Sequence, residues 1–197
     1  MCGRYNLTDE QSLEIQKILE RLDQKYKTSN IKTGEIFPTN LVPVLVAEKE
    51  QIEPIPCAWG FPNFKNKGVI INARSETAFE KKTFRDSLIN RRCIIPANGF
   101  YEWNKSKEKI YFTQPDQKII YMAGIYNVFK NESRFVILTT NANQSIVDVH
   151  DRMPLILHKK QLQSWLFENG QTQTMLSQVP TILERKSDYE QTRFDLI

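Results

Sequence analysis

The chain of 197 residues is 40% hydrophobic and 25% charged, the composition of an ordinary globular domain that can bury a substantial core. No apolar run reaches the roughly 18 residues that a membrane span requires, and the start has no basic stretch followed by an apolar one, as a secretion signal would. We therefore expect no membrane partner and a location in the cytoplasm or at the nucleoid. The formal net charge of +4 permits nucleic-acid binding but is also common among unrelated enzymes.

The cysteines and histidines limit the kinds of metal or disulfide site that the chain can hold. The three cysteines, Cys2, Cys57 and Cys93, are widely spaced and form no CxxC pair, and there are two histidines. This pattern argues against a zinc site and against a disulfide framework, and we expect no metal and no cofactor. Cys57 and Cys93 sit in apolar stretches and are predicted to fill the core.

The first predicted element is a helix over residues 9–26. Thr8 followed by Gln11 resembles a capping box. Ile18, Leu19 and Leu22 then continue at helical spacing. This segment is the longest helical pattern before the chain changes character near residue 36.

Short β-rich runs follow, separated by Pro, Gly and Asn as strands and turns usually are. They cover residues 41–48, 52–59, 68–73, 92–97, 99–103, 109–114, 118–129 and 134–140. A second helix is predicted over Thr77–Ile89 and a third over Lys159–Glu168, with Gly170 as its stop signal. The tail from about residue 171 is polar and is expected to wrap the surface. The pattern predicts one α+β domain, residues 1–197, dominated by a mixed or antiparallel sheet.

The second residue has chemistry that no internal cysteine has. Initiator methionine is normally removed when a small residue follows it, and removal would leave Cys2 with a thiol and a primary amine two carbons apart. The amine can condense with an aldehyde to an imine, and the thiol can close onto the same carbon as a five-membered thiazolidine. An α-amine with a pKa of about 7.7–8.0 is roughly a tenth neutral at pH 7, against ~0.04% for a lysine side chain.

Four segments together resemble a known family. They are Met1-Cys2-Gly3-Arg4, Asn72-Ala73-Arg74-Ser75-Glu76-Thr77, Gly99-Phe100-Tyr101-Glu102-Trp103 and His150-Asp151-Arg152-Met153-Pro154. Each motif is weak alone, but in this order they resemble the SOS-response-associated peptidase family, also called abasic-site processing proteins. The resemblance runs from residue 2 to about residue 157.

The resemblance implies a single α+β domain with a branched, partly barrel-like mixed sheet, flanked by helices around a basic cleft. It implies that a monomer crosslinks covalently to abasic sites in single-stranded DNA, with lyase and autoproteolytic peptidase activity as further possibilities. The implied catalytic residues are Cys2 as the nucleophile, Asn72 as a hydrogen-bonding group, and Glu102 and His150 as proton carriers. The implied DNA contacts are Arg4, Arg74 and Arg152 to phosphates and Trp59 to a nucleobase.

These roles also make physical sense. An abasic deoxyribose is mostly a closed hemiacetal, so its aldehyde appears only after proton transfer to the ring oxygen. A carboxyl near an aromatic wall, as expected for Glu102, has a raised pKa and can be that acid. A histidine titrates near neutrality and can pass the proton back. Guanidinium groups bind phosphates bidentately, and aromatic stacking tolerates any base.

One segment departs from the family pattern. Where the family usually has Trp-Gly-x-x-Pro-x-Trp, this chain has Trp59-Gly60-Phe61-Pro62-Asn63-Phe64, which is one residue shorter and ends in Phe. The residue that would wedge between bases near Phe64 is therefore not defined by the sequence.

Two other functions fit the same residues. Cys2, His150 and Asn72 have the residue types of a cysteine peptidase or of an N-terminal-nucleophile amidohydrolase. A non-catalytic single-strand binding module would use only Trp59 and the arginines. Each residue also has a structural alternative, since Asn72 could belong to a turn, Glu102 to an amphipathic strand and His150 to a helix cap.

Overall fold

The computed structural model describes residues 2–10, 12–27, 30–64, 67–115 and 119–187. Its centre is a ring of strands in the order β12–β4–β3–β8–β11, closed by the pairing of β11 with β12. The ring consists of β3 (Leu41–Glu48), β4 (Gln51–Trp59), β8 (Arg92–Ala97), β11 (Ile120–Phe129) and β12 (Glu132–Asn141). Within it, β12 runs parallel to β4 and the other neighbours are antiparallel. The expected mixed, barrel-like sheet is confirmed.

Two tight hairpins set the register of the ring. Lys49 and Glu50, between β3 and β4, have φ angles of 46° and 65°. Lys130 and Asn131, between β11 and β12, have φ angles of 49° and 66°. Two consecutive positive φ angles are typical of a type I′ turn, whose twist matches that of the paired strands. The turns themselves therefore fix these two pairings.

The inside of the ring is a close-packed apolar core. Every residue of β8 is buried, and β3, β11 and β12 add runs of buried side chains. Cys57 and Cys93 lie in this core, as predicted. A Cβ atom at Gly124 would come within 2.4 Å of the Ile95 side chain and 2.8 Å of the Val136 carbonyl, so only glycine fits there.

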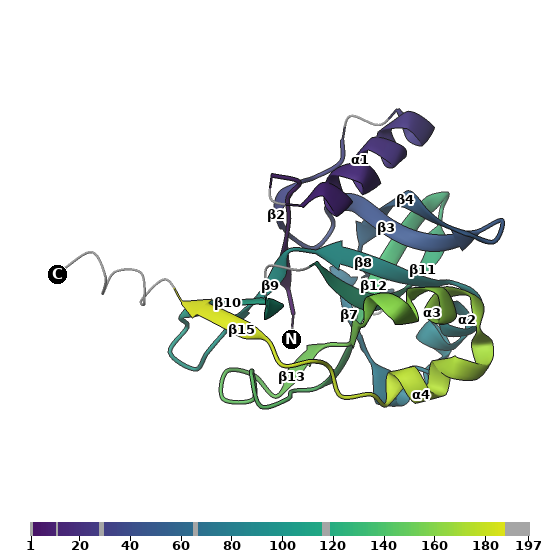
Figure 1. The fold of residues 1–197 in the computed structure, drawn as a ribbon. Helices are drawn as coiled ribbons and strands as arrows, with labels where there is room; N and C mark the ends of the chain where they lie inside the picture. The colour runs from purple at the N-terminus through teal and green to yellow at the C-terminus, as the bar shows by residue number, and fades with distance from the viewer. Residues whose placement is uncertain (1, 11, 28–29, 65–66, 116–118, 188–197) are drawn as a thin grey trace.

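Shorter strands branch from the ring, and a second sheet lies beside it. β7 (Asn72–Arg74) and β13 (Arg152–Pro154) pair with β12, and β14 (Ile156–Leu157) pairs with β11. The second sheet has the order β15–β10–β9–β1–β2 and consists of β1 (Arg4–Leu7), β2 (Gly34–Ile36), β9 (Gly99–Trp103), β10 (Lys109–Thr113) and β15 (Glu184–Ser187). β5 (Phe61–Pro62) and β6 (Val69–Ile70) form a separate pair. The start of the chain lies where the second sheet meets the ring (Figure 1).

The helices cover the outside of the ring, with bounds that differ from those predicted. Helix α1 (Leu13–Tyr26) contacts β3 and β4, whereas α2 (Lys82–Asn90) contacts β8 and β11. α1 begins four residues later than expected, because Ser12 is its cap and accepts a hydrogen bond from the Ile15 N–H at 3.3 Å. The predicted partner in the capping box, Gln11, lies outside the described residues. A 3₁₀ turn, Ser75–Thr77, precedes α2, which begins five residues later than predicted.

The C-terminal part contains more structure than the sequence suggested. A 3₁₀ turn over Lys159–Gln161 leads into α3 (Leu162–Phe167). Gly170 does not end the helical region, because it lies inside a second 3₁₀ turn and α4 (Thr172–Leu176) follows. Within the tail that was expected to wrap the surface, Met175 and Leu176 of α4 pack into the core and β15 extends the second sheet. None of the helices in the described part of the chain is long and apolar enough to cross a membrane.

Candidate functional site

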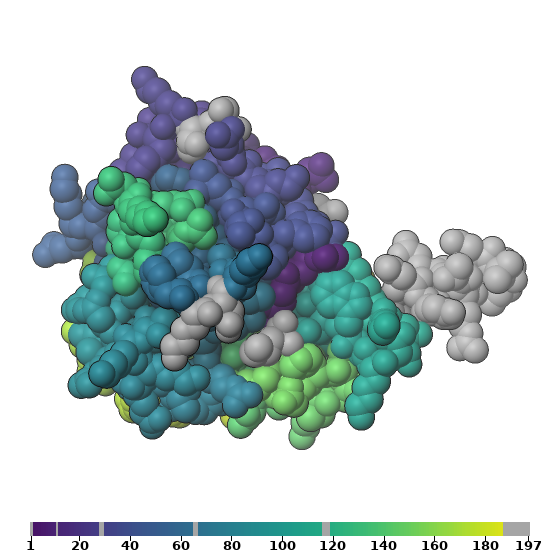
Figure 2. All heavy atoms as spheres, turned by 180° about the vertical axis from the view of Figure 1, so that it is seen from behind, coloured from purple at the N-terminus to yellow at the C-terminus, as the bar shows by residue number. Residues whose placement is uncertain are grey.

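Strand pairing brings the start of the chain to the Gly99–Trp103 segment. Arg4 of β1 lies opposite Tyr101 of β9. Glu102, the next residue of β9, is close enough to Cys2 for its negative charge to raise the pKa of that thiol, although burial is the larger cause. Cys2 is fully buried. In the space-filling view a strip of the purple N-terminal segment lies beside teal residues in the region of β9 and β10 (Figure 2).

The Asn72 side chain reaches the same place from the ring. Its Nδ2 donates a hydrogen bond to the Cys2 carbonyl oxygen at 2.9 Å. β7 holds Asn72 in position by pairing with β12, where Asn72 lies opposite Ile137. The Asn72 Oδ1 is buried and accepts no hydrogen bond from the described residues. Asn72 thus anchors the Cys2 backbone and retains an acceptor for a bound group.

Glu102 has the properties of a proton carrier at neutral pH. Its side chain is 3% exposed, and burial raises its pKa to about 7. The expected cause was the flanking aromatic rings, but alternation along a strand sends Tyr101 and Trp103 to the opposite face of β9. Burial of the Glu102 face is therefore the cause. A carboxyl with a pKa near 7 can both give and accept a proton under physiological conditions.

His150 lies at the start of the segment that leads into β13. Its Nδ1 accepts a hydrogen bond from the Arg152 backbone N–H at 2.9 Å, and the Asp151 carboxylate oxygen Oδ1 is 2.8 Å from the same nitrogen. Burial lowers the pKa of His150. The charge of Asp151 also raises the pKa of Glu102, so the histidine segment lies within electrostatic reach of the carboxyl on β9.

Arg152 is a buried clamp in this structure. Its side chain is 7% exposed and forms a bidentate ion pair with Glu76, with nitrogen–oxygen distances of 2.7 and 2.8 Å. The same guanidinium donates to the Asn141 side chain at 2.7 Å and to the Thr139 carbonyl at 2.6 Å. The expected phosphate contact does not fit, because the terminal nitrogens Nη1 and Nη2 are both engaged by the protein. Instead, Arg152 ties β13 to the residues that follow β7.

The other two arginines proposed to contact phosphates, Arg4 and Arg74, differ in how many groups of the protein they contact. Arg4 lies 3.3 Å from the Glu35 carboxylate, and its guanidinium lies 4.1 Å from the centre of the Phe37 ring and 5.0 Å from that of Trp103. Arg74 has an exposed side chain that forms no ion pair with the described part of the chain. Arg74 is therefore the arginine best placed to meet a phosphate.

Trp59 belongs to the core. It is fully buried, its indole N–H donates to the Ile71 carbonyl at 3.0 Å, and its ring stacks on Phe135 at 6.2 Å with an interplanar angle of 8°. The expectation that Trp59 stacks on a nucleobase is therefore not met in this structure. The exposed ring of the segment is Phe64, which is 84% exposed and lies 6.3 Å from Phe129.

The geometry does not assemble the Cys-His-Asn triad of a cysteine peptidase. In such a triad the asparagine orients the histidine, but the Asn72 amide donates to the Cys2 carbonyl. Burial also raises the pKa of the Cys2 thiol strongly, which disfavours the thiolate that such a peptidase needs. Sequence reasoning gave no role to Asp151, although it stands inside a recognised motif.

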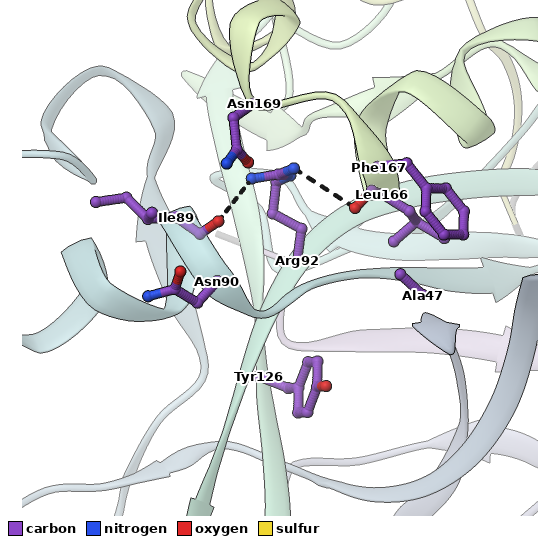
Figure 3. A pocket seen from close by; sticks show the side chains of 8 residues that line it. All are labelled: Ala47, Ile89, Asn90, Arg92, Tyr126, Leu166, Phe167 and Asn169. Carbon is purple, nitrogen blue, oxygen red and sulfur yellow. Dashed lines mark hydrogen bonds between the residues drawn. The ribbon is translucent and has the colours of Figure 1, made fainter. Parts of the chain in front are cut away.

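A small pocket elsewhere has a structural explanation. It measures about 250 Å³ and is lined by residues of β3, α2, β8, β11 and the α3 region, none of them proposed for the site (Figure 3). The Arg92 guanidinium at its wall donates to the carbonyls of Leu88 and Ile89, each at 3.0 Å, and to that of Trp165. These carbonyls belong to the C-terminal turns of α2 and α3, whose partial negative charge favours a cation. Arg92 joins two helix ends.

Comparison with known proteins identifies the family. The model of the family described as SOS response associated peptidase (SRAP) matches residues 1–193, and the chain belongs to this family. Two relatives are named abasic site processing proteins. YoqW from Bacillus subtilis is 30% identical over 183 residues, which cover 84% of this chain and 80% of the relative. YedK from Escherichia coli is 29% identical over 176 residues, which cover 84% and 79%.

Solved structures share the fold. A protein from Bacteroides thetaiotaomicron superposes with a TM-score of 0.75 at 23% identity, covering 94% of this chain and 91% of its own. A protein from Bordetella bronchiseptica gives the same TM-score and identity and covers 94% and 99%.

Proposed function

We propose that this protein forms a covalent crosslink with abasic sites in single-stranded DNA through Cys2, once Met1 has been removed, and so shields the lesion. The observation that carries the proposal is the convergence of distant segments on the start of the chain. Asn72 holds the Cys2 carbonyl at 2.9 Å, and the pKa of the neighbouring Glu102 is raised by burial to about 7. The names of the relatives YoqW and YedK point to the same substrate.

The chemistry balances without a cofactor. Glu102 protonates the ring oxygen of the sugar hemiacetal while the anomeric hydroxyl gives up its proton, so the ring carbon–oxygen bond breaks and the aldehyde forms. The Cys2 amine adds to the aldehyde carbon, and loss of one water gives the imine. The Cys2 sulfur then bonds to the same carbon while its proton passes to the nitrogen, which closes the thiazolidine. His150 and Glu102 carry the protons in these steps and in the reverse reaction, because the pKa of Glu102 is raised to about 7 and a neutral imidazole can accept a proton.

The DNA strand is held chiefly by its backbone in this proposal. Arg74 contacts a phosphate beside the lesion, since its side chain is exposed and lacks an ion pair with the described residues. Arg4, which lies 3.3 Å from the Glu35 carboxylate, is the second phosphate contact in this proposal. Backbone contacts of this kind bind without regard to sequence, which suits a protein that recognises a missing base.

The test is whether a denaturation-resistant adduct depends on Cys2. The wild-type protein, with removal of Met1 verified by intact mass, should form such an adduct with an abasic single-stranded oligonucleotide. Cys2→Ala should form none, and Cys2→Ser should give at most an imine that borohydride traps. Cys57→Ala, a change at a buried cysteine in the core, is the control that should retain the adduct. A full stable adduct from Cys2→Ala would overturn the proposal, and peptide cleavage without any adduct would favour a peptidase.

A further inference from the structure

Two neighbours of the His150 Nδ1 atom within the described part of the chain make opposite demands on it. The Arg152 backbone N–H donates to it at 2.9 Å, and Oδ1 of Asp151 lies 2.8 Å away. A ring nitrogen either carries a proton and donates, or carries a lone pair and accepts. Nδ1 can therefore satisfy only one of these neighbours at a time, and that choice fixes which nitrogen carries the proton of the neutral ring.

The surroundings keep the ring neutral, so the position of that proton matters. Burial lowers the pKa of His150. The charge of the Arg152 guanidinium also lowers the pKa of His150. The Glu76 carboxylate lies 2.7 Å from that guanidinium and offsets part of its charge. Asp151 supplies the negative charge that raises the pKa of the ring. Since an unperturbed histidine has a pKa of about 6.5, His150 is neutral at physiological pH.

We propose that Asp151 is a positioning residue that selects the tautomer of His150. When Asp151 accepts a hydrogen bond from the Nδ1–H group, Nε2 holds the lone pair and can take a proton as a base. The imidazolium continues to donate its Nδ1–H hydrogen bond to Asp151 and returns the other proton from Nε2. The Asp151 carboxylate stays ionised throughout. When the Arg152 N–H donates to Nδ1 instead, the proton sits on Nε2 and the neutral ring cannot act as a base there.

The architecture supports this assignment from both sides. The Arg152 peptide group is fixed because its side chain is buried and paired with Glu76, so the N–H that faces Nδ1 cannot turn away easily. The Asp151 carboxylate is 83% exposed and can approach or leave Nδ1 at little cost. Its charge also reaches Glu102. One exposed carboxylate thus influences both proposed proton carriers. The catalytic part of this role rests on the proposed function, whereas the tautomer does not.

The tautomer can be measured directly. The chain has two histidines, His150 and His158, so ¹⁵N imidazole spectra contain two sets of signals, and His158→Gln identifies those of His150. Asp151→Asn should shift the neutral ring toward the Nε2–H form and lower its pKa by about half a unit, the scale of an exposed ion pair. Asp148→Asn is the matched control and should change neither value, because that exposed carboxylate pairs with Arg185 at 2.6 Å.

Reaction rates give a second readout. Asp151→Asn should slow reversal of the adduct about threefold at pH 7, which corresponds to the same half unit of pKa, with unchanged affinity for undamaged DNA. A wild-type tautomer ratio and pKa in Asp151→Asn would overturn the proposal, and so would an unchanged reversal rate. If the wild-type protein formed no adduct, the proposed function would fail, but the spectra would still decide whether Asp151 selects the tautomer.

Discussion

The closed ring of strands and the junction that holds Cys2 differ in what fills them. Inside the ring, β8 is buried along its whole length and the neighbouring side chains are apolar. At the junction, the buried groups include Glu102, Arg152 and Asn72, which come from three distant segments. Burying an apolar group stabilises the fold, whereas burying a carboxyl costs free energy unless its partners compensate. Substitutions in the ring should therefore destabilise the fold, whereas those at the junction can destabilise or stabilise it, depending on whether the group removed is paired.

The largest effect is expected inside the ring. Trp59→Ala should lower the free energy of unfolding by about 3–5 kcal/mol, because it removes a fully buried indole side chain and leaves a cavity. Urea denaturation measures this loss. Trp59→Phe keeps most of the volume and should lose less, chiefly the hydrogen bond to Ile71. Near-wild-type stability of Trp59→Ala would contradict the placement of Trp59 in the core.

The second largest loss of stability is expected for Arg152, whose ion pair with Glu76 is buried. Arg152→Ala should cost about 3 kcal/mol, because it breaks a buried, bidentate ion pair. Glu76→Gln should cost less, since the Glu76 side chain is 41% exposed. Urea denaturation compares the two variants, and DNA titrations at several salt concentrations show whether a phosphate contact was lost. Full stability of Arg152→Ala together with a shallower salt dependence would restore Arg152 as a phosphate contact.

Removing the charge of Glu102 should stabilise the fold rather than destabilise it. Its folded pKa of about 7 lies above the value of about 4.3 for an unfolded glutamate. The folded state therefore binds the extra proton between these values, and the carboxyl destabilises the fold increasingly as pH rises from about 4.3 to 7. Glu102→Gln should be more stable than the wild type at pH 8, by about 2 kcal/mol, while its crosslinking of bound DNA slows. A stability difference that stays constant between pH 5 and 8 would refute the shifted pKa.

Arg74 should have the smallest effect on stability. Arg74→Ala should change the free energy of unfolding by no more than about 0.5 kcal/mol, because the side chain is exposed and lacks an ion pair with the described residues. The slope of log K against log salt for single-stranded DNA should become shallower by about 0.7, one phosphate contact. Titrations at several salt concentrations beside a melting curve measure both. An unchanged slope in a stable variant would remove Arg74 from the DNA site.

Some elements were predictable because local patterns determine them. Strands such as β3, β4, β8 and β9 follow β-rich runs bounded by turn residues, and their predicted bounds agree with the structure to within one residue. α4 escaped prediction because five residues carry too little periodicity. β1, β2 and β15 escaped because each is short and depends on a partner strand far away in the chain.

The sequence by itself determined the family motifs, the α+β class and the special chemistry of a cysteine at position 2. Only the tertiary structure decided which motif residues are accessible and what each one contacts. Arg74 and Arg152 have the same side chain and similar motif positions, yet one is exposed and the other is buried against Glu76. Tertiary packing likewise buries Trp59 in the core, although its motif predicted a ring exposed to a nucleobase. Burial and ion pairing arise from contacts between segments far apart in the chain, and no local pattern encodes them.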